Sequence, residues 1–154
     1  MTTENSLDQW VVLRLDCGEF ALPVCHVLEV LRMVAIQSLP EAPPWVAGIL
    51  NLRGRGIMVM DLRQRLGLPA KEPALHSQIV IVDTREGTLG LIADEVIDII
   101  TLSRSAFKPA EQLSGVSPLF TALAHAGERL ILILDVDRLT SDTFTTVAVG
   151  ASHA

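Results

Sequence analysis

A glycine-rich turn, Arg53-Gly-Arg-Gly56, carries the charged side chains whose spacing most directly suggests chemistry. Glycine-rich loops can cradle phosphate, but the phosphate loop is a longer Gly-x-x-x-x-Gly-Lys-Ser/Thr run that opens a helix. The residues that follow here, Ile57 to Met60, are apolar and are predicted to form a strand. The glycines therefore indicate a hairpin turn. Arg53 is either a solvated turn arginine or an anchor for a partner protein, and the local sequence leaves both interpretations open.

Carboxylates are the next candidates, because two of them can act together as general acid and general base. Glu29 and Asp98 occupy equivalent positions of an internal repeat, so we expect them in separate parts of the fold. Contact with a partner is the favoured role for Glu29. Asp94, Glu95 and Asp98 lack the Asp-x-Asp-x-Asp-Gly pattern of a calcium loop, and carboxylates at a helix N-terminus explain them better.

The histidines and cysteines show no spacing typical of a metal site or of a nucleophile with its base. The chain has four histidines and two cysteines, without a Cys-x-x-Cys pair or a Gly-x-Ser-x-Gly elbow. The sequence therefore predicts a protein that is not an enzyme and that has no metal site and no cofactor.

The elements that would position these residues occur twice. Phe20 to Val30 matches Leu89 to Ile99 at a constant offset of 69 residues, and Ile57 to Arg63 matches Ile131 to Asp137 at an offset of 74. Two half-chains with the same apolar pattern predict two similar small β units packed together. The charged turn is not repeated, which directs attention to Arg53.

Alternating apolar residues and turn residues predict the elements of the first half. Cys25 to Met33 is ambiguous, because its apolar spacing also fits a short helix that leads into an extended stretch. Asp61 is predicted to cap a short helix that ends at Gly67. The predicted strands are Trp10–Leu15, Phe20–Val24, Trp45–Leu52 and Ile57–Met60.

The pattern restarts after a boundary at Pro69 to Pro73. Asp94 is predicted to open a helical turn toward Ile99, and Asp135 to Leu139 to form a helical stub. Few strands with tight glycine turns favour small barrels over a parallel sheet, which needs regular helices between strands. The predicted strands are Gln78–Asp83, Leu89–Ala93, Leu119–Ala124 and Leu130–Leu134.

Composition excludes several classes of protein. Of the 154 residues, 49% are hydrophobic and 19% charged, so most of the chain is expected to fold. The net charge of −6 argues against nucleic acid as a partner, because phosphate contacts need a basic surface. No apolar run approaches the roughly 20 residues that span a bilayer, and the N-terminus carries no secretory signal. We expect a cytoplasmic protein with reduced cysteines and no direct membrane insertion.

The order and spacing of several motifs resemble those of the CheW family, the coupling proteins of bacterial chemotaxis arrays. The resemblance covers about residues 10–140. It is carried by Val27-x-Glu29-Val30, Leu39-Pro40-x-Ala-Pro43, Gly48-Ile-Leu-Asn51-Leu-Arg53-Gly54, Asp61-Leu-Arg63-x-x-Leu66-Gly67, Gly90-x-x-x-Asp94-x-Val96-x-Asp98-Ile99 and Gly127-Glu-Arg-Leu-Ile-Leu-Ile-Leu-Asp135.

The resemblance implies a mainly β fold of two pseudo-symmetric, five-stranded, SH3-like β-barrels with short helices. It also implies a non-catalytic cytoplasmic adaptor at receptor arrays beneath the inner membrane. Such an adaptor couples the cytoplasmic tip of chemoreceptors to the regulatory domain of a CheA-type histidine kinase, and other CheW-like proteins are further candidate partners. In the family the receptor tip docks in an apolar groove between the barrels. The candidates for partner contact are Val27, Glu29, Gly48, Arg53, Val96 and Ile99.

We expect a flexible N-terminus over residues 1–8, a single CheW-like domain over 9–140 and a flexible tail over 141–154. The first barrel is predicted over about 20–68 and the second over about 78–139, with strand 10–15 at their junction or in the first barrel. Two alternative functions remain. One is a coupler in a related surface-motility or surface-sensing pathway, and the other is a small-ligand-binding β-barrel.

Overall fold

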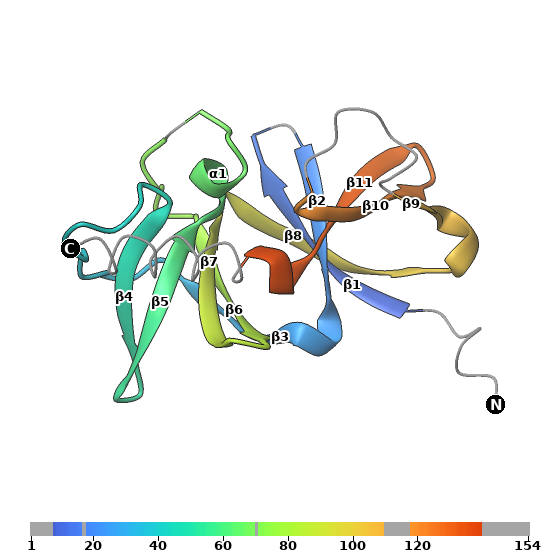
Figure 1. Ribbon diagram of the computed structural model, residues 1–154. Coiled ribbons are helices and arrows are strands. Elements are labelled where there is room, and N and C mark those ends of the chain that lie inside the picture. Colours follow the sequence, from blue (N-terminus) through green and yellow to red (C-terminus); the bar gives the residue numbers. More distant parts are fainter. Residues whose placement is uncertain (1–7, 17, 70, 110–117, 140–154) are drawn as a thin grey trace.

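The computed structural model describes residues 8–16, 18–69, 71–109 and 118–139, which form two β-sheets side by side (Figure 1). Cys17 and the predicted flexible tail over 141–154 lie outside these ranges. Of the predicted flexible N-terminus, only Asp8 lies inside them, and it already belongs to the first strand, β1 (Asp8–Leu15).

The mainly β fold expected from the sequence is confirmed. The six-stranded sheet has the order β8-β1-β2-β11-β10-β9, and the five-stranded sheet has the order β3-β6-β7-β5-β4. The strands of the first are β1, β2 (Gly18–Pro23), β8 (Glu95–Leu102), β9 (Phe107–Pro109), β10 (Phe120–Ala126) and β11 (Arg129–Leu134). Those of the second are β3 (Val27–Arg32), β4 (Val46–Leu52), β5 (Arg55–Asp61), β6 (Gln78–Thr84) and β7 (Gly87–Ala93). The described helical pieces are α1 (Leu62–Arg65), η2 (Val24–His26), η3 (Arg104–Ala106) and residues 136–139.

Each sheet contains strands from both halves of the sequence. β1 and β2 join β8 to β11 in the six-stranded sheet, whereas β6 and β7 join β3, β4 and β5 in the other. The predicted division into barrels over about 20–68 and 78–139 therefore does not match the sheets. The repeat identifies equivalent residues, but it does not say with which copy a strand pairs. The predicted strand 10–15 lies within the six-stranded sheet, between β2 and β8.

The two sheets show the predicted pseudo-symmetry in their strand order and in the register of their parallel strands. Apart from the short β9, the two sheets have the same strand order when repeat-equivalent strands are compared. Each sheet has one parallel pair, in which Phe20 lies opposite Leu132 and Leu89 lies opposite Met58. These two pairs of residues occupy equivalent repeat positions. In both sheets, therefore, the first two strands of one half of the sequence pair in the same way with strands of the other half.

The largest apolar cluster holds the two sheets together. It contains fully buried side chains of both sheets, among them Leu13 and Leu22 from one and Met60, Val80 and Leu91 from the other. Two smaller clusters each lie within a single sheet. Burying one such side chain fully contributes about 1.5–3 kcal/mol, so the shared cluster makes the two sheets one packed body.

One segment predicted as helical is a strand, because β8 replaces the helical turn predicted from Asp94 toward Ile99. The ambiguous segment Cys25 to Met33 is a short helix, η2, that leads into the extended strand β3, which is one of the two interpretations left open. In β3 half-buried and exposed residues alternate with a period of two, as in a strand. Both strands lie at a sheet edge and carry apolar residues on both faces, which is why their apolar spacing also fits a helix.

The short helix after β5 begins and ends as predicted. The Asp61 Oδ1 accepts a hydrogen bond from the Arg63 N–H at 3.0 Å, and Gly67 has a φ of +79°. The equivalent Asp135 accepts from the Arg138 N–H at 3.1 Å. Burial raises the pKa of Asp61 above its ordinary value, although backbone N–H groups and the charge of Arg63 act in the opposite direction.

We predict that Asp61→Asn raises the melting temperature at pH 7. Asparagine caps helices as well as aspartate does, and it removes the cost of keeping a buried carboxylate ionised. Because the folded-state pKa is raised, wild-type stability falls as the pH rises through it. The advantage of Asp61→Asn should therefore shrink as the pH is lowered toward about 4, the ordinary aspartate range.

Thermal melts of both proteins between pH 4 and 8 check this prediction. Asp135→Asn is the matched control, because Asp135 is the equivalent cap but is more exposed and lies 3.4 Å from the Arg138 Nε. It should not raise the melting temperature. A difference between wild type and Asp61→Asn that is the same at every pH would contradict the argument.

Candidate partner-binding surface

The outermost strands β3 and β8 expose apolar side chains at equivalent positions of the two sheets. Leu28 and Val30 on β3 are 56% and 39% exposed, and Ile97 and Ile99 on β8 are 37% and 59% exposed. Unpaired apolar strand edges promote aggregation unless a partner covers them. We call these four residues the apolar edge residues. Of them, the sequence analysis assigned only Ile99 to the site.

Val27 and Val96 lie at the base of the two edge strands, and their contact with a partner stays a prediction. Both are half-buried and pack against the shared core cluster, so they support the two edge strands from beneath. Their equivalence in the repeat is reproduced, since each is the first apolar residue of its edge strand.

Gln78 joins the edges of the two sheets and was missed by the sequence analysis. Its Oε1 accepts a hydrogen bond from the Val96 N–H of β8 at 2.8 Å, while its backbone pairs with Arg32 of β3. This residue therefore links the start of one edge strand to the end of the other. The only signal in the sequence is a polar residue at the head of an apolar strand.

Arg53 and Glu29 are brought together by the fold. Arg53 occupies a two-residue turn between β4 and β5, with a φ of +50°, and Gly54 follows with a φ of +86°. This is the φ pattern of a type I′ hairpin turn, which matches the twist of the flanking strands. The Asn51 Oδ1 accepts from the Gly54 N–H at 2.9 Å, and the Arg53 guanidinium forms an ion pair with the Glu29 carboxylate.

The Arg53–Glu29 pair suits recognition better than stability. The Arg53 side chain is 69% exposed, and ion pairs in water contribute about 0–1 kcal/mol to stability. A guanidinium has five N–H donors, so it can hold Glu29 and a partner carboxylate together. Glu29 belongs to β3 and lies between Leu28 and Val30, two of the apolar edge residues, while its own side chain and that of Val30 are on opposite faces of the strand.

Gly48 does not belong to the exposed surface. It is buried at a bulge of β4, and a Cβ there would lie 2.1 Å from the Gln37 carbonyl oxygen. Its φ of +147° is also one that side-chain-bearing residues rarely adopt. The physical reason for glycine is close backbone packing against the segment that precedes β4, so we assign Gly48 to the scaffold.

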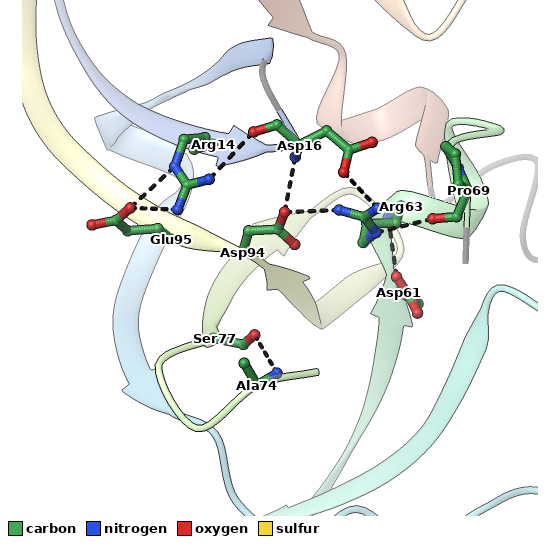
Figure 2. A network of polar contacts seen from close by, with 9 residues as sticks. All are labelled: Arg14, Asp16, Asp61, Arg63, Pro69, Ala74, Ser77, Asp94 and Glu95. Carbon is green, nitrogen blue, oxygen red and sulfur yellow. Dashed lines mark hydrogen bonds and ion pairs between the residues drawn. The ribbon is translucent and has the colours of Figure 1, made fainter. Parts of the chain in front are cut away.

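The carboxylates of β8 and its flank do not cap a helix as predicted. Asp98 lies 3.4 Å from Arg129, whose guanidinium also forms a 2.8 Å ion pair with Glu19 of β2. The hydrogen bonds to Glu19 and Asp98 raise the pKa of Arg129. Asp94 and Glu95 instead bind Arg63 and Arg14 in the network of Figure 2. All three carboxylates are thus committed to arginines of neighbouring elements.

The described residues show neither a candidate metal site nor a candidate membrane-spanning helix. No group of three or more His, Cys, Asp or Glu side chains in the described ranges is placed to bind a metal ion. Within the same ranges, no helix is long and apolar enough to cross a membrane.

Comparison with known proteins agrees with the fold. The family model described as a CheW-like domain matches residues 9–144. A probable chemotaxis protein CheW of Rhizobium etli is 27% identical over 142 residues, which cover 90% of each chain. Protein PilI of Pseudomonas aeruginosa is 35% identical over 95 residues, which cover 60% of this chain and 53% of PilI.

A solved structure extends this similarity to three dimensions. The scaffolding protein TtCheW of Thermoanaerobacter tengcongensis matches with a TM-score of 0.82 and 30% identity, covering 87% of this chain and 92% of TtCheW. Since the family model spans most of the chain and a solved CheW structure has the same fold, this protein belongs to the CheW-like family.

Proposed function

We propose that this chain is a non-catalytic cytoplasmic adaptor that couples chemoreceptors to a CheA-type histidine kinase at receptor arrays. The observation that carries the proposal is the pair of apolar strand edges, β3 and β8, with the exposed Arg53–Glu29 pair beside the first. Relatives named as chemotaxis proteins and a relative described as a scaffolding protein support it.

The receptor tip is the proposed occupant of the apolar edge residues. A protein interface typically has an apolar centre and a polar rim. The edge residues would supply the centre, and Arg53 with Glu29 would supply charged contacts at the rim. The kinase regulatory domain and other CheW-like proteins are the further proposed partners, bound on surfaces that leave this region free.

A related surface-motility or surface-sensing pathway is the second candidate. The match to PilI favours it, because PilI is a relative that is not named for chemotaxis. The proposed adaptor mechanism would be the same in either pathway, with a different receptor and a different kinase.

Co-sedimentation tests the proposal directly. The protein is mixed with receptor-bearing membranes and the matching histidine kinase, and kinase activity is measured in the pellet. We expect kinase recruitment and activation that depend on this chain. A well-folded protein that recruits no kinase, with receptors and kinases of both pathways, would sink the adaptor role.

We predict that Arg53→Glu weakens assembly about tenfold, because a charged anchor at the rim is reversed. The fold should be unchanged, since the Arg53 side chain is exposed. The positive φ at this position strains glutamate no more than it strains arginine. Sedimentation of the variant with receptor membranes measures the effect. Arg104→Glu is the matched control, because Arg104 is an exposed arginine on η3 and the change in net charge is identical.

The double exchange Glu29→Arg with Arg53→Glu separates two roles of Arg53. It restores an ion pair within the chain while reversing the charge presented at the turn. If Arg53 acts by contacting the partner, the exchange should not restore assembly. Full restoration would mean that Arg53 acts only by holding Glu29.

A further inference from the structure

Two ion pairs of opposite polarity occupy equivalent positions of the repeat, and each joins the two sheets. Asp16 follows β1 and Arg85 follows β6, at an offset of 69 residues. Their partners, Arg63 and Asp137, lie in the helical turns after β5 and β11, at an offset of 74 residues. We call the Asp16–Arg63 contact the first joint and the Arg85–Asp137 contact the second joint.

The first joint is centred on a buried arginine and is multiply bonded (Figure 2). The Arg63 side chain is 7% exposed, and its guanidinium lies 2.6 Å from the Asp16 Oδ1 and 2.8 Å from the Asp94 Oδ2. Its Nε donates to the Pro69 carbonyl oxygen at 3.1 Å. The same Asp94 oxygen accepts from the Asp16 N–H at 2.8 Å, which closes the network.

Arg63 remains charged in this setting. Burial lowers the pKa of Arg63. The hydrogen bond to Asp16 and the charge of Asp94 raise it by more than burial lowers it, so the pKa is above its ordinary value. Removing Arg63 is expected to be destabilising, because the Asp94 side chain, which is only 15% exposed, would lose its cation.

The second joint is exposed and loose. The Arg85 side chain is 85% exposed, and its Nε lies 3.4 Å from the Asp137 Oδ2. The Arg85 N–H also donates to the Asp137 Oδ1 at 2.9 Å. Exposed pairs of this kind contribute little, so the two equivalent joints differ greatly in strength.

The first joint lies where the chain passes from one sheet to the other. Asp94 is the single residue between β7 of the five-stranded sheet and β8 of the six-stranded sheet. Its N–H donates to the Arg14 carbonyl oxygen at 3.1 Å, and Arg14 holds Glu95, the first residue of β8, through a 2.7 Å ion pair. From this joint β8 runs along β1, where Ile99 lies opposite Val11, so the joint and the β1 ladder together hold Ile99.

We propose that Arg63 is a positioning residue for the partner-binding surface, fixing β8 of one sheet relative to β3 of the other. The exposed second joint does not perform this task. A partner that docks across both edges needs them at one spacing, and loss of Arg63 would let that spacing vary. The link to binding rests on the proposed function, whereas the link to sheet geometry does not.

Pulsed electron paramagnetic resonance measures the spacing of the two sheets to which β3 and β8 belong. One spin label is placed at Ile49→Cys on β4 and the other at Leu130→Cys on β11, after Cys17 and Cys25 are replaced by serine. Both labelled positions are partly exposed and lie in different sheets. Arg63→Met, Arg63→Lys and Arg85→Gln are compared with the labelled parent, and each is also tested for binding to receptor-bearing membranes.

A second variant covers the case in which Arg63→Met leaves too little stability to fold. Asp16→Asn, Arg63→Met and Asp94→Asn together remove the charges of both ion pairs of Arg63, so that neither of its two carboxylate partners is left without a cation. Asparagine also tolerates the φ of +56° at position 16.

The expected result is a broader distance distribution and about tenfold weaker membrane binding for Arg63→Met and the triple variant. Arg63→Lys should be intermediate, because a single ammonium cannot bridge both carboxylates and Pro69. Arg85→Gln should match the parent in both measurements. A distance distribution as narrow as that of the parent, in the folded triple variant, would overturn the proposal. A broader distribution combined with membrane binding as tight as that of the parent would also overturn it. A parent that does not bind receptor membranes would refute the proposed function, while the distance distributions still decide the role of Arg63 in sheet geometry.

Discussion

Gly48→Ala is expected to lower the free energy of unfolding by about 4 kcal/mol, from backbone strain and overpacking together. The added Cβ would lie 2.1 Å from the Gln37 carbonyl oxygen, at a φ of +147°. The neighbouring segment cannot simply retreat, because Gln37 and Ile49 exchange two backbone hydrogen bonds of 2.9 and 2.8 Å. Urea unfolding of the variant and the wild type measures the difference.

Two nearby glycines supply the controls. Gly56→Ala should cost less than about 1 kcal/mol, because its nearest contact would be the Ile49 Cγ2 at 3.4 Å and its φ is ordinary. Gly54→Ala should cost about 1 kcal/mol from its positive φ alone, since nothing lies within 4 Å of the added carbon. If Gly48→Ala unfolds at the same urea concentration as Gly56→Ala, the packing account is wrong and Gly48 returns to the list of partner contacts.

Gly48 illustrates why a motif is weaker evidence for a site than for a fold. The motif containing Gly48 and Arg53 correctly indicated the family, and both residues were assigned to partner contact. The structure separates them, because Arg53 is exposed at a turn while Gly48 lies under Gln37. The segment that contains Gln37 pairs with β4 through the isolated bridge between Gln37 and Ile49, which no local pattern in the sequence reveals.

Apolar alternation and turn residues predicted the hairpins, capping residues predicted the cap at Asp61, and the repeat predicted the equivalence of the two sheets. The repeat depends only on which residues are apolar. It could not predict that the first two strands of each copy join the other copy. Strand pairing is decided by contacts between residues distant in sequence, and equivalent strands present nearly the same apolar pattern to either partner.

Charged residues were predictable only as individual candidates. Glu29 and Arg53 were each proposed for the site, but their ion pair depends on a fold that brings an edge strand to a distant turn. Arg63 was not proposed for any role, because an arginine in a short helix is usually solvated. Its burial follows from Asp16 and Asp94, which approach it from two other parts of the chain.

Ile99→Asp is expected to weaken binding to receptor-bearing membranes by about 30-fold or more, the effect of losing a central apolar contact of an interface. The side chain is 59% exposed, so the fold should lose little stability. Leu130→Asp is a close control, because Leu130 is 56% exposed on β11 and undergoes the same chemical change away from the two edge strands. Equal binding by both variants would remove β8 from the proposed surface.

Val30 extends this test from one edge strand to both. It is the repeat equivalent of Ile99, lies on β3 and is 39% exposed. If one partner spans both edges, Val30→Asp alone should weaken binding as Ile99→Asp does, and the double variant should bind less tightly than either. If the two edges bind different partners, each substitution should impair only one of the receptor and kinase interactions. Separate binding measurements with receptor membranes and with the kinase distinguish these arrangements, because a shared surface couples the two substitutions and separate surfaces leave them independent.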